Sequence, residues 1–131
     1  MKKTNILFVA PSDVDFDALE KAFNSHPNFI CDKTDSSEAA KKYVKENKVD
    51  VVVAAEQLPD ETGLSCVQEV VKMNPFINCA LCSSADPDDF HEFTEGYGVV
   101  MQFSVTPTVK ETYEFIEKLS KIYQLTGESE Q

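Results

Sequence analysis

The sequence predicts a doubly wound α/β sandwich built on a five-stranded parallel sheet, and three observations lead to this class. Five short apolar segments alternate with amphipathic segments along the 131 residues. Two of the apolar segments are almost continuously hydrophobic, as strands covered on both faces of a parallel sheet are. The segments between them carry helix-start signals and are joined by short connections. The prediction is one domain, residues 1–125, followed by a polar tail, residues 126–131.

The predicted strands are residues 5–10, 28–33, 50–55, 77–83 and 99–103. The first reads NILFVA and the third DVVVAA, which are the two nearly continuous apolar runs. Parallel strands end at one edge of the sheet, and sites on such sheets form there. The loops that follow Ala10, Ala55, Ser83 and Phe103 are therefore expected to carry the function.

Helices are predicted between the strands because each intervening segment begins with capping residues. Capping boxes run from Ser12 to Asp15, from Asp35 to Glu38 and from Thr108 to Glu111, and Asp86 precedes Pro87 as a cap. Helical spacing also predicts which side chains face the core. The predicted stripes are Phe16, Leu19 and Phe23; Leu64, Val67 and Val71; and Val109, Tyr113, Ile116 and Tyr123.

Charge and composition exclude several classes of function. The chain has 23 Asp plus Glu against 12 Lys plus Arg, a formal net charge of −11. Binding to nucleic acid or to anionic lipid depends on cationic side chains, so neither is an expected partner. No apolar run approaches the length needed to cross a bilayer, and the first residues do not form a signal peptide. A cytoplasmic protein is expected.

The four cysteines are predicted to be reduced and structural. Cys79 and Cys82 form a C-x-x-C pair, but they lie in a predicted strand, where residues three apart are about 10 Å apart and face opposite ways. No second Cys pair or His cluster completes a metal site. Reduced cysteines also agree with a cytosolic location.

Other chemistries of this architecture lack their residues. The loop after the first strand, Ala10-Pro11-Ser12-Asp13, has no glycine to bring backbone N–H groups to a phosphate. A Gly-x-Ser-x-Gly elbow is absent. His26 and His91 have no neighbouring nucleophile and are expected at the surface.

The segment from Asp50 to Gly63, DVVVAAEQLPDETG, carries a specific pattern. Pro59 and Gly63 stand four and eight residues after Ala55, with a buried strand before it. In this spacing the chain resembles the receiver domain of two-component response regulators, close to the chemotaxis type, across residues 3–125. The resemblance implies a flavodoxin-like (βα)5 fold with strand order 2-1-3-4-5. It places Ala55 where the family carries its phosphorylated Asp.

The resemblance also implies that the phosphorylation chemistry is lost. The acidic pair that ends the family's first strand aligns with Ala10 and Pro11, and its Lys-Pro pair with Thr106 and Pro107. Ser83 matches the Ser or Thr that ends the fourth strand. Transfer to Asp needs a carboxylate nucleophile, a cation held by acids and a positive charge, and all three are missing. Phe103 matches the aromatic switch residue, and Pro107 is expected to keep the family's cis peptide bond.

Two acidic features offer alternatives. Glu56 adjoins Ala55, but strand alternation points it to the other face, and placing it at the acceptor position breaks the spacing to Pro59 and Gly63. The run from Asp86 to Asp89 has no calcium-loop spacing and suits a helix start. Asp13 and Asp60, which flank the pocket, suit helix-start and turn roles.

The sequence thus predicts a degenerate pseudo-receiver: a phosphorylation-independent protein–protein interaction module of bacterial phosphorelay signalling, with no enzymatic activity, cofactor or metal. Its expected contact surface is residues 86–124, its expected partner a sensor kinase or a downstream effector, and a homodimer stays open. Two alternatives remain. One is a receiver phosphorylated at a non-standard residue. The other is a small-molecule sensor that uses the vacated pocket bounded by Ala10, Pro11, Ala55 and Ser83.

Overall fold

The structure, a computed structural model, describes residues 3–125, with side chains described as far as Tyr123. The predicted tail, residues 126–131, lies outside the described residues. The strands are β1 (Thr4–Val9), β2 (Phe29–Thr34), β3 (Val51–Ala54), β4 (Asn78–Cys82) and β5 (Val99–Phe103). The helices are α1 (Asp17–Asn24), α2 (Ser37–Glu46), α3 (Gly63–Met73), α4 (Pro87–Thr94) and α5 (Val109–Leu125).

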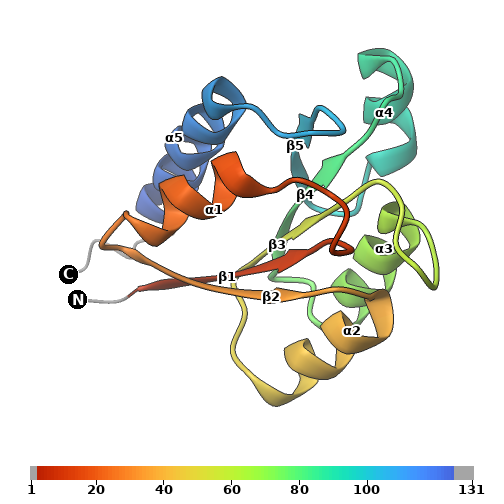
Figure 1. Ribbon diagram of the computed structural model, residues 1–131, viewed down its shortest axis with the longest axis horizontal. Helices are drawn as coiled ribbons and strands as arrows, with labels where there is room; N and C mark the ends of the chain where they lie inside the picture. Colours follow the sequence, from red (N-terminus) through yellow and green to blue (C-terminus); the bar gives the residue numbers. More distant parts are fainter. Residues whose placement is uncertain (1–2, 126–131) are drawn as a thin grey trace.

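The five strands form one sheet in the order β2-β1-β3-β4-β5, and every pair is parallel. Helices α1 and α5 pack together on one side of the sheet and α2 and α3 on the other (Figure 1). The predicted fold class and strand order are confirmed. The order reverses beside β1 and β3, so the loops that follow these two strands meet at the edge where a site is expected.

The core fills both faces of the sheet. Residues Val51 to Ala54 of β3 are fully buried, as the uninterrupted apolar run predicted. Between the sheet and the α1–α5 layer, Phe23 makes edge-to-face ring contacts with Phe8 and Phe115 at 5.9 and 6.0 Å between ring centroids. Phe115 in turn contacts Phe103 at 5.3 Å. These aromatic contacts tie α1, α5, β1 and β5 into one unit.

The first helix begins later than its capping signal predicted. The backbone N–H of Val14 donates to the carbonyl of Pro11, so the segment after β1 forms a turn before α1 starts at Asp17. The side chain of Asp15 then accepts from the N–H of Asp17. The predicted start at Ser12 is therefore wrong, because the turn uses the residues that the box would have used.

The stripe predicted for the last helix is also wrong in part. Val109 and Tyr113 are 60% and 61% exposed, whereas the buried side chains of α5 are Thr112, Phe115 and Leu119. Helical spacing fits either set, and packing against Phe23 and Phe103 selects the second. The predicted box at its start is confirmed: Glu111 N–H donates to Thr108 Oγ1, and Thr108 N–H donates to Glu111 Oε1, both at 3.1 Å.

Candidate functional site

The positions that the resemblance identified gather at the carboxyl edge of the sheet. Ala10 and Ala55 directly follow β1 and β3, and they are 0% and 2% exposed. Their N–H groups extend the sheet ladder, from Ala10 to the carbonyl of Thr34 at 3.0 Å and from Ala55 to that of Val9 at 2.8 Å. Methyl groups therefore occupy the floor of the site. Pro11 beside them is partly buried, and Thr106 is exposed on the loop after β5.

Gly63, the first residue of α3, lies so close to the backbone of Ala55 that position 63 has no room for a side chain. A Cβ at Gly63 would stand 1.9 Å from the carbonyl oxygen of Ala55 and 2.8 Å from a methyl carbon of Leu81. The N–H of Gly63 also donates to the carbonyl of Glu56 at 2.9 Å. The Gly spacing in the sequence thus has a steric cause in the packing of α3 on β3.

Ser83 lies where the loop after β4 begins, and its hydroxyl is engaged. Its Oγ accepts from the N–H of Ala85 at 3.1 Å, and its own N–H donates to the carbonyl of Phe103 at 3.0 Å. The side chain of Gln102 in β5 donates to the carbonyls of Ser83 and Ala85 at 3.2 and 2.9 Å. Phe103 is fully buried, as a core aromatic is.

Glu56 turns toward the loop after β4. Its Oε2 accepts from both the backbone N–H and the hydroxyl of Ser84, each at 2.9 Å. The carboxylate is thus bonded across the edge of the sheet to the loop after β4, while Ala55 beside it is buried.

The loop after β3 is held against the start of α2 by two carboxylates of the loop itself, those of Asp60 and Glu61. Asp60 accepts from the N–H groups of Ser37 and Glu38 at 3.0 and 2.9 Å, and these bonds lower the pKa of Asp60. Asp60 therefore does have a helix-start role, but for α2 instead of its own helix. Glu61 accepts from the hydroxyls of Ser37 and Ser65, which lower the pKa of Glu61.

The loop after β5, which contains Thr106 and Pro107, is held by Glu111 from the start of α5. Glu111 Oε2 accepts from the N–H and hydroxyl of Ser104 at 3.1 and 2.7 Å. Burial opposes its charged form, but the bonds from Ser104 and Thr108 outweigh burial and lower the pKa of Glu111. The cis bond expected before Pro107 is wrong, since all peptide bonds of residues 3–125 are trans. Trans is the lower-energy X–Pro isomer, and this loop is closed by Glu111 instead.

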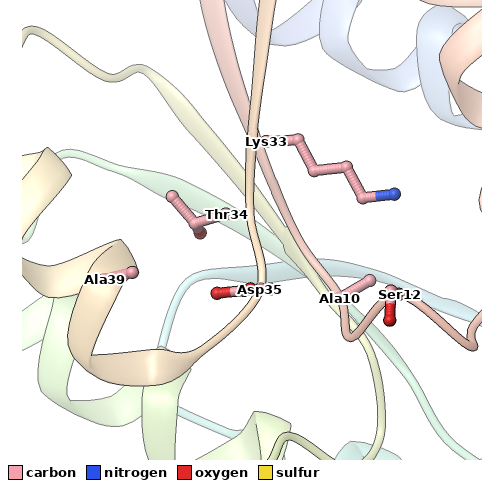
Figure 2. Close-up of a pocket in the computed structure, with 6 residues that line it drawn as sticks. All are labelled: Ala10, Ser12, Lys33, Thr34, Asp35 and Ala39. Atoms are coloured by element: carbon pink, nitrogen blue, oxygen red, sulfur yellow. The ribbon is translucent and has the colours of Figure 1, made fainter.

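A hollow of about 450 Å³ lies beside the expected pocket, at the ends of β1 and β2 (Figure 2). Its lining residues are Ala10, Ser12, Lys33, Thr34, Asp35 and Ala39. Figure 2 shows Lys33 and Thr34 leaving the end of β2 in opposite directions. Lys33 forms an ion pair with Glu20 at 3.2 Å. Of the four residues predicted to bound a vacated pocket, only Ala10 lines this hollow.

Acidic clusters give no metal arrangement. Within residues 3–125, no group of three or more His, Cys, Asp and Glu side chains is placed to hold an ion. Asp86 caps α4, where its Oδ2 accepts from the N–H of Asp88 at 3.1 Å, as the helix-start reading predicted. Asp13 is exposed.

Cysteines and histidines take structural or surface places. All four cysteines are free thiols, and burial raises the pKa of Cys79 and of Cys82 to about 12. His91 is exposed, and His26 accepts from the N–H of Asn28 through Nδ1. In the part of the chain that the structure describes, no helix is long and apolar enough to cross a membrane.

The surface expected to contact partners, residues 86–124, exposes fewer aromatic rings than its composition suggests. Phe103 and Phe115 are core residues, Phe90 is 6% exposed, and Tyr97 and Tyr123 are partly buried. Phe93 and Tyr113 are exposed, together with Val105 and Val109.

Sequence reasoning missed Gln102 and the loop contacts of Glu56, Asp60 and Glu111. Each of these side chains bonds to a residue distant in sequence or lies outside the motifs of the family pattern. Only the Thr108–Glu111 capping box gave a local signal, and it did not indicate the bonds to Ser104.

Comparison with known proteins gives a family and a fold. A family profile described as "Domain of unknown function (DUF3303)" matches residues 30–122. No curated protein sequence matches the chain.

Solved structures with the same arrangement are receiver domains. A CheY-like response regulator receiver domain protein from Methanospirillum hungatei has a TM-score of 0.81 at 12% identity, covering 96% of this chain and 100% of that chain. The signal receiver domain of an HD domain-containing protein from Pseudomonas fluorescens has a TM-score of 0.80 at 15% identity, covering 98% and 95%. The chemotaxis response regulator CheY4 of Vibrio cholerae has a TM-score of 0.72 at 10% identity, covering 90% and 99%. At these identities the likeness establishes the receiver fold.

Proposed function

We propose that this chain, which belongs to the DUF3303 family, is a phosphorylation-independent pseudo-receiver that acts by binding signalling proteins. The proposal combines the receiver fold with the residues found at its functional edge. It includes a role in two-component signal transduction and the absence of an enzymatic activity.

One observation carries the proposal: methyl groups stand where phosphoryl transfer needs carboxylates. Ala10 and Ala55 are buried at the ends of β1 and β3, and Thr106 supplies no cation. A phosphoryl group would find no carboxylate nucleophile at position 55, and position 106 supplies no positive charge to stabilise its oxygens. The loss of all the charged members together leaves no buried ion without a partner.

Binding is proposed through residues 86–124, where α4, β5 and α5 meet the edge of the sheet. Phe93, Val105 and Tyr113 supply exposed apolar groups of the kind that anchor interfaces. The carboxylates of Asp88, Asp89, Glu92 and Glu95 are exposed on or beside α4, and no Lys or Arg lies between Lys72 and Lys110. A partner with a basic surface is therefore favoured, whether a sensor kinase or a downstream effector.

Incubation with acetyl phosphate and Mg²⁺ tests the proposal, with beryllofluoride as a second probe. We expect the intact mass to stay unchanged, and the melting temperature measured in Mg²⁺ to be the same with and without either reagent. An active receiver domain treated in parallel serves as the positive control. A mass increase of one phosphoryl group would instead establish a receiver phosphorylated at a non-standard residue.

A further inference from the structure

We infer that Glu56 and Gln102 are positioning residues for α4: together they hold the loop between β4 and α4, and through it the helix. The loop consists of Ser83, Ser84, Ala85 and the capping residue Asp86. The inference concerns the chain alone. Only its consequence for partner binding rests on the proposed function.

The hydrogen bonds of the loop depend on side chains from outside it. The N–H of Ser84 donates to Glu56, and the carbonyls of Ser83 and Ala85 accept from Gln102. The N–H groups of Ser83 and Ala85 bond to the carbonyl of Phe103 and to Ser83 Oγ, respectively. Without Glu56 and Gln102, three of these backbone groups would have no protein partner, and water would have to replace them.

Helix α4 has little else to fix its place. Among the described elements it packs mainly against β5. It is eight residues long, and its buried side chains are Phe90 and Thr94. Thr94 Oγ1 bonds within the helix, to the carbonyl of Phe90 at 2.8 Å. A short helix with so few tertiary contacts takes its position from the segment that leads into it.

Glu56 and Gln102 come from opposite sides of that segment. Glu56 follows β3 and Gln102 lies in β5, so the loop is held from both neighbours of β4. The bonds from the N–H and hydroxyl of Ser84 to the Glu56 carboxylate are made within the chain, so they need no bound ligand and no modification of the protein. Contacts within the chain therefore hold α4, and with it part of the proposed contact surface, in place.

Hydrogen exchange of the α4 amides tests this inference, because these amides contact neither side chain. We expect Glu56→Ala and Gln102→Ala each to speed exchange across residues 90–94 by about ten-fold, the factor that the loss of one charge-assisted or paired hydrogen bond implies. Exchange in β1 and α1 should remain as in the wild type. Glu56→Gln keeps an acceptor for Ser84 and should restore most of the protection. Gln102→Glu loses both donors and should not.

Two further variants keep the test decisive. Glu20→Ala removes a partly buried carboxylate and its ion pair with Lys33 at the far edge of the sheet, and should leave α4 unchanged. Ser84→Ala removes one of the two bonds to Glu56 at an exposed side chain, and should give a smaller acceleration of exchange.

The inference is overturned if α4 exchanges at the wild-type rate in Glu56→Ala and Gln102→Ala. It is also overturned if exchange rises equally in β1 and α1, which indicates a general loss of stability. Neither result depends on phosphorylation or on a partner.

Discussion

At the scale of single residues, close packing between Gly63 and Ala55 determines which side chains the end of β3 can accommodate. Gly63 packs directly on the carbonyl oxygen of Ala55, and the spacing between the two was visible in the sequence. The steric cause was not, because a one-dimensional pattern cannot show that α3 approaches the end of β3. Packing alone therefore accounts for a glycine at position 63, whatever residue stands at position 55.

Gly63→Ala should destabilise the fold by about 3 kcal/mol, the upper part of the range for overpacking. The new Cβ would overlap a backbone oxygen, which cannot rotate away as a side chain does. Urea denaturation measures the change in the free energy of unfolding. Gly96→Ala is the control: it meets nothing within 4 Å, and only its positive φ opposes the substitution, at about 1 kcal/mol. Equal losses in the two variants would contradict the steric account.

Ala55→Asp should not restore phosphorylation, and it should lower stability by about 3 kcal/mol at pH 7, the cost of an uncompensated buried charge. Position 55 is 2% exposed, and neither Ala10 nor Thr106 brings a charge to it. Burial should raise the pKa of the new carboxyl, so the loss should shrink as pH falls and the group becomes neutral. Urea denaturation at pH 7 and pH 5 measures this, with Ala55→Asn as the uncharged control. A phosphorylated Ala55→Asp protein would refute the prediction.

At the scale of elements, local signals located most of the structure and long-range contacts explain the remainder. The predicted strand over residues 99–103 matches β5, and the other strands differ from their predictions by about one residue at each end. Three of the connections that hold the functional loops span 19 to 28 residues: Gln102 to Ser83, Ser37 to Asp60 and Ser84 to Glu56. Such pairs have no periodicity or spacing that a single sequence could reveal.

The contact between the β3–α3 loop and α2 should make stability depend on pH. Bonds from Ser37 and Glu38 lower the pKa of Asp60 in the folded protein. A lowered pKa stabilises the fold above the unfolded value, near 3.9, and this contribution is lost as pH falls through the folded pKa. Asp60→Ala should therefore lower the melting temperature at pH 7 and have little effect at pH 2. Asp13→Ala, at an exposed carboxylate, should change neither. A loss of equal size at both pH values would contradict this account.

The two faces of α5 should respond differently to truncation. Phe115→Ala should cost about 3–5 kcal/mol, as large-to-small changes of buried aromatic residues do, because its ring contacts Phe23 and Phe103. Tyr113→Ala should remain within about 0.5 kcal/mol, since Tyr113 is 61% exposed. Urea denaturation of both variants measures the difference. A large loss for Tyr113→Ala would instead favour the stripe that helical spacing first predicted.

At the scale of the whole molecule, the net charge of −11 is unevenly compensated. The ion pairs described for residues 3–125 join Lys33 to Glu20 and Lys41 to Glu61 and Glu69, so they lie on the α1–β2 and α2–α3 sides. The carboxylates of Glu92 and Glu95 at the end of α4 have no ion pair within that range. The fold class and the strand order could be anticipated from sequence. The segregation of charge could not, because it depends on which helices share a side.

This segregation predicts that added salt stabilises the protein. Screening weakens the repulsion among unpaired carboxylates, and few ion pairs exist to be weakened with it. The melting temperature should rise between 10 and about 200 mM NaCl, where the Debye length falls below about 10 Å.

Glu92→Gln combined with Glu95→Gln should raise the melting temperature at low salt and reduce its dependence on salt. Both positions lie away from the start of α4, so the favourable contacts of Asp88 and Asp89 with the helix dipole remain. Lys42→Gln combined with Lys45→Gln is the matched control, at exposed positions of α2, and should have the opposite effect. A melting temperature that falls with salt in the wild type would mean that the hydrogen-bonded carboxylates of the loops outweigh the net repulsion.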